Sequence, residues 1–242
     1  DNFCAYCIVP HVRGREASRP PAQIVDECRR LVDDGCKEIM LLGQNVNSYG
    51  KGVEPRATFP DLLGAINDIP GLLRLRFVTS HPKDATRELF AAIGTLDKVC
   101  EHIHLPPQSG SDRILKEMNR HYTSSHYREL VGMARELAVD IEFAADLIVG
   151  FPGETEQDFQ QTLSLMRDVE FLNCFVFRYS PRPGTAAAKL DDDIPLEVKA
   201  RRNTEVLDLQ QQISERKNAA MHSRIVEVLV EGPSKKNADV LS

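Results

Sequence analysis

The chain has 242 residues, of which 42% are hydrophobic and 27% are charged, a composition typical of a folded globular protein. No stretch approaches the roughly 20 apolar residues of a membrane helix, and no secretory leader is recognisable, so we expect a protein without a membrane partner. The net charge of −6 gives no general tendency to bind nucleic acid. Six cysteines, scattered apart from one pair, argue against a secreted disulfide framework and predict a cytoplasmic protein with reduced thiols.

Helical and strand patterns alternate along the chain with a repeat of roughly 30 residues, which predicts parallel βα units. The expected strands are apolar runs that end in loops rich in Gly, Pro or polar residues: 37–42, 73–79, 101–105, 141–149 and 173–179. The expected helices have apolar residues at helical spacing or favourable end signals: 22–34, 59–68, 84–94, 111–118, 123–138, 155–169 and 195–220. Thr155 and Asp158 have the spacing of a capping box.

Five strands, with a further strand expected before Asp1, predict an α/β fold: an open, partial parallel β/α barrel whose first strand lies outside this sequence. Sites in such folds form at the carboxyl ends of the strands. Residues 224–232 alternate like a half-buried strand and fit neither pattern. We therefore expect a core domain at 1–222 and the beginning of a small β module at 223–242.

The pair Cys4 and Cys7 has C-x-x-C spacing in an expected loop, where two thiolates can converge on one metal site. Zinc sites and redox pairs share this spacing. The other cysteines supply no second pair for zinc, and Val9-Pro10 with a basic run follows where a redox motif would begin a helix. The pair is therefore interpreted as two ligands of an iron–sulfur cluster, with a third cysteine expected directly before Asp1.

Candidate ligand-binding residues follow the expected strands. They are Gly43, Gln44, Asn45, His81, His102, His104, Gln108, Ser109, Ser111 and Arg182. Glycine permits close backbone approach, and amide, hydroxyl and imidazole groups offer donors and acceptors. Each candidate has a structural alternative: an ordinary turn at 43–45, polar barrel-interior residues or metal ligands at His102 and His104, and helix capping at 108–111.

Basic residues occur in two places. Arg13, Arg15 and Arg19 suit the phosphates of an RNA, with an affinity that falls as salt rises, or are ordinary solvated surface. The last expected helix mixes its basic residues with acidic ones, which favours a solvated face. Those basic residues are Lys199, Arg201, Arg202, Arg216 and Lys217.

Six segments, taken in order, resemble the radical S-adenosylmethionine methylthiotransferases, and among them the MiaB-type tRNA 2-methylthioadenosine synthases. They are Asp1–Arg19, Leu41–Tyr49, Thr79–Pro82, His104–Ser111, Ile148–Thr155 and Tyr179–Thr185. The similarity covers essentially the whole chain, and residues 229–236 resemble the start of the family's RNA-binding TRAM module.

The resemblance implies a transferase that replaces the C–H at C2 of N6-isopentenyladenosine, next to the anticodon, with a methylthio group. Its cofactors would be S-adenosylmethionine and a [4Fe-4S] cluster bound by Cys4, Cys7 and the upstream cysteine. A second [4Fe-4S] cluster would lie in an amino-terminal domain absent from this sequence. The partners would be the anticodon stem-loop of a tRNA and an electron donor.

Residue roles also follow from the resemblance. Tyr6 would shield the adenine of S-adenosylmethionine, residues 43–45 would hold its amino group, and the backbone of Val149 and Gly150 would meet its adenine. Alternative activities are methylthiolation of threonylcarbamoyl-adenosine or of a ribosomal-protein aspartate, or RNA binding without catalysis. Residues 1–242 alone are expected to bind the cluster poorly and to be inactive.

Overall fold

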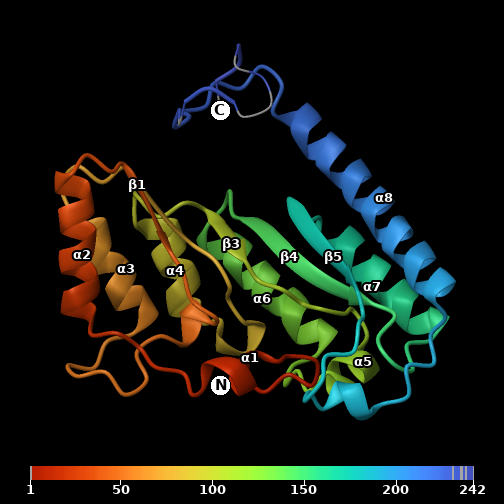
Figure 1. Cartoon of the computed structure of the whole chain (residues 1–242). Coiled ribbons are helices and arrows are strands. Elements are labelled where there is room, and N and C mark those ends of the chain that lie inside the picture. The colour runs from red at the N-terminus through yellow and green to blue at the C-terminus, as the bar shows by residue number, and fades with distance from the viewer. Residues whose placement is uncertain (1, 231, 235–236, 238, 242) are drawn as a thin grey trace.

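The computed structural model describes residues 2–230, 232–234, 237 and 239–241 (Figure 1). The strands are β1 (Glu38–Leu41), β2 (Arg74–Phe77), β3 (His102–His104), β4 (Glu142–Val149) and β5 (Asn173–Arg178). The α-helices are α1 (Val9–Arg13), α2 (Pro21–Asp33), α3 (Phe59–Asn67), α4 (Arg87–Thr95), α5 (Asp112–Glu117), α6 (Ser124–Leu137), α7 (Glu156–Val169) and α8 (Leu196–Ala220). These elements confirm the five expected strands and the alternating βα order.

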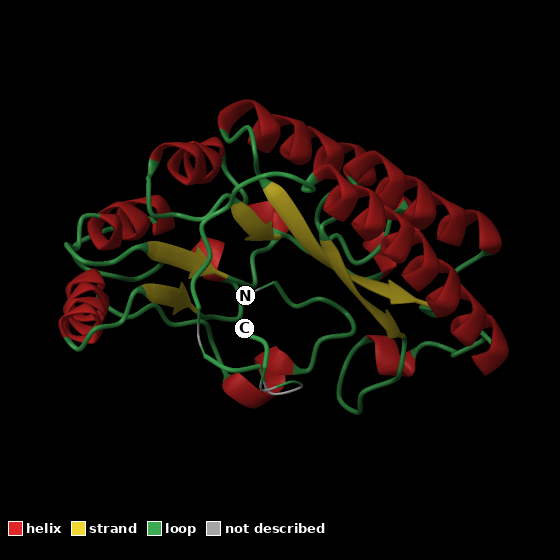
Figure 2. Ribbon diagram, turned by 90° about the horizontal axis from the view of Figure 1, so that it is seen from above, coloured by secondary structure: helices red, strands yellow, loops and turns green. Residues whose placement is uncertain are grey.

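All strand pairs are parallel. β1 pairs with β2, and β3, β4 and β5 form a second sheet in that order. The segment after α4 joins the two sheets: the Leu75 amide donates to the Lys98 carbonyl (2.6 Å) and the Cys100 amide donates to the Leu75 carbonyl (3.0 Å). The strands therefore form one curved layer with helices on its outer side, as Figure 2 shows. In the described residues the layer does not close into a ring, which confirms the predicted open barrel.

The core lies between this layer and the helices. Along β4, Phe143, Ala145, Leu147 and Val149 are buried, while Asp146 is half-buried on the opposite, concave face. This alternation follows from the two-residue period of a strand. The burial of each large apolar side chain contributes roughly 1.5–3 kcal/mol to folding, which holds the helices on the outer face.

Local signals set the start of α7. The Thr155 hydroxyl accepts a hydrogen bond from the Asp158 amide (3.2 Å), and the Asp158 carboxylate accepts one from the Thr155 amide (2.9 Å). The predicted capping box is confirmed. α4 begins later than expected, at Arg87, because Pro82–Asp84 form a separate 3₁₀ turn and Thr86 then caps the helix.

Two other segments differ from expectation. Residues 224–230 form no strand, and Ile225 and Val228 are largely exposed; the expectation was wrong there because no strand in the described part of the chain pairs with this segment. Glu231, within the expected strand, lies outside the described residues. After the cysteine pair, a one-turn helix (α1) replaces the expected loop, with Pro10 in its first turn.

None of the helices in the described part of the chain combines the length and apolar character needed to cross a membrane.

Candidate functional site

A cavity of about 860 Å³ opens at the carboxyl ends of β1, β2 and β3, within the size range of small-molecule sites. The cysteine loop (residues 2–7) and α1 form its other side. The predicted site residues that line it are Cys4, Tyr6, Cys7, Arg13, Arg15, Arg19, Gly43, Gln44, Asn45, His81, His104 and Gln108. The fold thus gathers residues that are up to about one hundred positions apart in the sequence.

The cysteine loop is held by backbone hydrogen bonds on both sides. The Cys7 amide donates to the Cys4 carbonyl (3.0 Å), which closes a tight turn. The Ala5 amide donates to the carbonyl of Met118 (2.9 Å), and the Ala5 carbonyl accepts from the amide of Ala187 (2.8 Å). Burial raises the pKa of the Cys7 thiol, and the nearby Cys4 raises it further. Both cysteines line the cavity.

The loops after β1 and β2 are joined to each other. The Asn47 side-chain amide donates to the His81 carbonyl (3.0 Å), and the His81 backbone amide donates to the Asn47 side-chain oxygen (2.9 Å). Asn45 Nδ2 donates to the Asp84 carboxylate (2.7 Å), whereas Asn45 Oδ1 is buried without a partner in the described residues. The β1 loop is therefore fixed in place and presents one acceptor to a ligand.

His81 is buried at the cavity wall, and its Nδ1 accepts a hydrogen bond from the Lys83 amide (3.2 Å). Burial lowers the pKa of His81 to about 2, and the charges of Arg120 and Lys83 add to the effect. A neutral imidazole whose Nδ1 accepts carries its proton on Nε2. His81 Nε2 is buried and has no partner in the described part of the chain, so its donor is unused.

His104 lies on the concave face of β3, with its Nε2 3.0 Å from the Asp146 carboxylate on β4. Its Nδ1 is buried without a partner among the described residues. His102 is on the same face, and burial lowers its pKa, with a further effect from Arg76. The described ranges contain no group of three His, Cys, Asp or Glu residues arranged to hold a metal ion. The pairing of His104 with Asp146 on the concave face fits the alternative of polar barrel-interior residues.

Six candidates are not among the residues that line the cavity: His102, Ser109, Ser111, Val149, Gly150 and Arg182. Ser109 is fully buried, with its hydroxyl 3.4 Å from that of Thr162. Val149 is fully buried, and the Gly150 amide donates to the Glu154 carboxylate (2.7 Å). Arg182 is exposed, but its charge partly offsets the effect of burial on the pKa of Cys7, which places it near the cysteine loop.

The other hydroxyl candidate, Ser111, has a structural role. Its hydroxyl accepts a hydrogen bond from the Ile114 amide (3.4 Å), which caps α5. It also donates to the Asp158 carboxylate on α7 (2.6 Å). The capping alternative is therefore confirmed for this residue.

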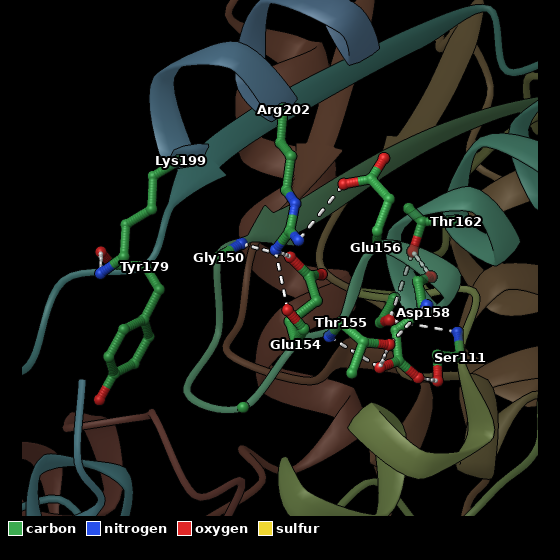
Figure 3. A network of polar contacts seen from close by, with 12 residues as sticks. Ser111, Gly150, Glu154, Thr155, Glu156, Asp158, Thr162, Tyr179, Lys199 and Arg202 are labelled. Carbon is green, nitrogen blue, oxygen red and sulfur yellow. Dashed lines mark hydrogen bonds and ion pairs between the residues drawn. The ribbon is translucent and has the colours of Figure 1, made fainter. Parts of the chain in front are cut away.

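A buried polar network joins the loop after β4 to α8 (Figure 3). Arg202 donates to the Glu154 carboxylate (2.8 Å), and Lys199 donates to that of Asp192 (2.6 Å). Both basic side chains are buried, so the predicted solvated face was wrong for them: each turns inward to a carboxylate. Burial raises the pKa of Glu154 to about 7, and the Gly150 amide and Arg202 oppose the rise. Gly150 thus lies in a turn fixed by α8.

Arg120 was not identified by the sequence reasoning. It follows α5, is only 6% exposed, and lines the cavity beside Cys4. Ser80, also buried at the cavity wall, has a hydroxyl without a partner in the described part of the chain. Arg120 lies in no local pattern that distinguishes it from an ordinary loop residue. Ser80 lies within the Thr79–Pro82 segment that carries the family resemblance, but that segment did not single out its hydroxyl.

Comparison with known proteins agrees with this geometry. Residues 1–166 match the Radical SAM superfamily. The chain is 54% identical over 241 residues to a tRNA-2-methylthio-N(6)-dimethylallyladenosine synthase of Clostridium botulinum, covering all of this chain and 54% of that protein. It is 54% identical over 242 residues to the same enzyme of Moorella thermoacetica, again covering all of this chain and 54% of the relative. The chain therefore spans about half the length of the curated relatives it matches.

Solved structures give the same fold. The radical S-adenosylmethionine methyltransferase TsrM from Kitasatospora setae superimposes with a TM-score of 0.63 at 20% identity, over 77% of this chain and 36% of that one. Coproporphyrinogen III oxidase (HemN) from Escherichia coli superimposes with a TM-score of 0.61 at 17% identity, over 80% of this chain and 46% of that one. The chain belongs to the Radical SAM superfamily.

The cofactors of this class are a [4Fe-4S] cluster and S-adenosylmethionine, and the cavity suits both. Cysteine thiolates are the ligands that such clusters require, and Cys4 and Cys7 open onto the cavity. S-adenosylmethionine carries an ammonium, a carboxylate and ribose hydroxyls, which need acceptors and donors. Asn45 Oδ1, His81 Nε2, Ser80 Oγ and His104 Nδ1 are buried atoms of lining residues without partners in the described residues. Because such atoms are costly to leave unpaired, they indicate a polar ligand.

Proposed function

We propose that this chain is the central part of a tRNA methylthiotransferase that acts on C2 of N6-isopentenyladenosine beside the anticodon. The observation that carries the proposal is the 54% identity over the whole chain to tRNA-2-methylthio-N(6)-dimethylallyladenosine synthases. The cavity supports it, because it combines two cysteines with unpaired polar atoms at the strand ends.

In this proposal Cys4 and Cys7 bind the cluster together with a cysteine upstream of residue 1. When bound, the cluster would supply the electron for reductive cleavage of S-adenosylmethionine, the source of a radical able to remove the C2 hydrogen atom of the substrate base. The residues of this chain bind and orient. Asn45 and His81 would hold polar groups of the cofactor, because Asn45 Oδ1 and His81 Nε2 each have no partner of their own in the described residues.

Other lining residues close the site around the reacting atoms. Tyr6 is half-buried next to Cys7 and provides an apolar ring against the adenine. Gln108 is buried after β3 and presents its side-chain amide to a ribose or base. Val149 and Gly150 contribute indirectly, through the shape of the turn that Glu154 and Arg202 hold in place. Ser109 also contributes indirectly, because its packing fixes the loop that follows Gln108.

The rim of the cavity suits an RNA. Arg13, Arg15 and Arg19 are exposed and line its edge. Arg19 forms an ion pair with Glu27 (2.7 Å), so Arg13 and Arg15 are the stronger candidates for phosphate contacts. Arg182, near the cysteine loop, is placed to meet the substrate. RNA enzymes of this kind splay the target base into the site, which the open barrel accommodates.

The remaining features concern the longer protein. Residues 1–222 form the radical domain and 223–242 begin a small RNA-binding β module. The second [4Fe-4S] cluster lies in an amino-terminal domain, and a cytoplasmic electron donor reduces the clusters. The isolated chain of residues 1–242 is inactive.

Mass spectrometry of tRNA nucleosides tests the activity. In a strain that lacks the gene, 2-methylthio-N6-isopentenyladenosine should disappear and N6-isopentenyladenosine should accumulate, and the full-length gene should restore the modified nucleoside. Complementation with Cys4→Ala or Cys7→Ala should fail. Loss of the methylthio group from threonylcarbamoyl-adenosine or from a ribosomal-protein aspartate, with 2-methylthio-N6-isopentenyladenosine unchanged, would overturn the proposal in favour of those substrates.

A further inference from the structure

Arg120 is a buried arginine whose guanidinium is held on three sides. Its Nη1 donates to the sulfur of Cys4 (3.4 Å), its Nη2 to the carbonyl of Pro106 (2.8 Å), and its Nε to the hydroxyl of Tyr122 (2.8 Å). The guanidinium carbon also lies 5.1 Å from the centre of the Tyr122 ring. Because every guanidinium nitrogen has a partner, the group has a single orientation.

The charge of Arg120 has no counterion in the described residues. No carboxylate in the described part of the chain pairs with it, and its acceptors are a thiol sulfur, a carbonyl and a hydroxyl. An arginine guanidinium stays protonated in folded proteins, so Arg120 carries a full positive charge. A buried charge without a counterion is destabilising. A negative group in the cavity beside Cys4 would remove that cost.

A cluster bound by three thiolates supplies such a group. Each thiolate carries one negative charge, and reduction adds one more. Hydrogen bonds to cysteine sulfur and nearby positive charge are among the factors that set the reduction potential of an iron–sulfur cluster. A fixed cation beside a cysteine ligand stabilises the reduced state more than the oxidised state, because the reduced state is more negative.

We propose that Arg120 is a positioning residue for the cluster: it fixes the Cys4 sulfur and supplies the positive charge that makes the cluster easier to reduce. This inference rests on the cluster-binding part of the proposed function. Tyr122 has a supporting role, because its hydroxyl accepts from Arg120 and donates to the Pro107 carbonyl (2.9 Å), which ties the arginine to the loop after β3.

The test is the midpoint potential of the cluster bound by Cys4 and Cys7, measured in full-length protein whose amino-terminal cluster cysteines are replaced by alanine. The protein is reconstituted anaerobically and titrated without S-adenosylmethionine while the reduced cluster is followed by electron paramagnetic resonance. Arg120→Met should shift the potential to a more negative value. Arg120→Lys, which keeps the charge but not the fork of donors, should give a smaller shift in the same direction. Tyr122→Phe should also give a small negative shift.

The matched control is Arg135→Met. Arg135 also donates to a backbone carbonyl, that of Val169 (2.6 Å), and also lies over an aromatic ring, but it is on α6, away from the cavity. Its substitution should leave the potential unchanged. Circular dichroism checks the fold of each variant.

The outcomes separate this inference from the proposed function. If the protein with an unchanged Cys4–Cys7 site loads no cluster there, the proposed function fails. If it loads a cluster and the potential of Arg120→Met matches that of the wild type, the role of Arg120 is wrong, even where the variant binds S-adenosylmethionine more weakly. If Arg120→Met does not retain a cluster, Arg120→Lys and Tyr122→Phe decide, and unshifted potentials in both overturn the inference.

Discussion

Asn47 and His81 exchange two hydrogen bonds across the loops that follow β1 and β2. The pair keeps the acceptor of Asn45 and the donor of His81 on the same wall of the cavity. Two strands that pair over only four residues would otherwise leave their following loops free to separate. The geometry of this wall therefore depends on one asparagine side chain.

We expect Asn47→Ala to lower the free energy of unfolding by about 1–3 kcal/mol, because it leaves backbone groups of His81 without partners. It should also weaken the binding of S-adenosylmethionine to the cluster-loaded full-length protein by roughly threefold to tenfold. Urea denaturation and isothermal titration measure the two effects.

Asn67→Ala is the matched control for this substitution. Asn67 also makes two hydrogen bonds between segments, to the Asp97 carboxylate and from the Lys98 amide, but it lies on α3. A similar loss of stability with unchanged binding is expected. Equal weakening of binding in both variants would show that the loss is only a general effect of instability.

The buried Glu154 should give the chain a pH-dependent stability. Because burial raises the pKa of Glu154 to about 7, the folded state keeps a proton that the unfolded state releases at lower pH. The protonated Glu154 therefore contributes fully to stability at pH values below its pKa in the unfolded chain. This contribution is lost as the pH rises to 7 and above. The difference in unfolding free energy between wild type and Glu154→Gln should fall between pH 5 and pH 8, by on the order of 1–3 kcal/mol.

Glu156→Gln provides the control for this pH dependence. Hydrogen bonding to Arg201 lowers the pKa of Glu156, so its contribution changes only at lower pH. The difference in unfolding free energy between wild type and Glu156→Gln should stay constant between pH 5 and pH 8. A flat difference for Glu154→Gln as well would contradict the assignment of a raised pKa to Glu154.

Gly150→Ala should destabilise the chain by about 2 kcal/mol or more. Gly150 has a φ of +69°, and a Cβ there would lie 2.4 Å from the Lys199 Cγ. Gly132→Ala, in α6 with open space around it, should be neutral or stabilising by up to about 1 kcal/mol. Thermal denaturation compares the two, and a Gly150→Ala protein as stable as Gly132→Ala would show that the turn is not constrained.

Arg13 and Arg15 are expected to contact phosphates of the RNA. Substitution of either by Ala should weaken binding of an anticodon stem-loop to the full-length protein at low salt. It should also reduce the slope of log affinity against log salt by about one. Fluorescence anisotropy over a salt series measures this. Arg167→Ala, an exposed position on the outer helix α7, is the control, and the same change in slope for that variant would argue against a specific contact.

The sequence predicted the strands and their following loops well, because apolar runs that end in Gly, Pro or polar residues are local signals. Parallel topology then placed Asn45, His81 and Gln108 at one edge. The burial of the Lys199 and Arg202 side chains could not be predicted from such local signals, because the charge pattern of α8 is also that of a solvent-exposed helix.

The sequence also failed to predict the role of Arg120 and the structure of residues 224–230. A single arginine in a short connection carries no periodic signal, and its burial depends on Cys4, Pro106 and Tyr122 coming together in space. For 224–230, alternation alone does not make a strand, because a strand also needs a neighbour to accept and donate its backbone hydrogen bonds.

The most direct test is the iron content and the reduced electron paramagnetic resonance spectrum of the full-length protein, measured with and without S-adenosylmethionine. We expect Cys4→Ala and Cys7→Ala each to remove one four-iron cluster and the change in the spectrum that S-adenosylmethionine causes. Cys36→Ala, which alters a half-buried thiol before β1 that does not line the cavity, should keep both. Full iron content and an unchanged response in Cys4→Ala and Cys7→Ala would contradict the proposal that this cavity holds the cluster.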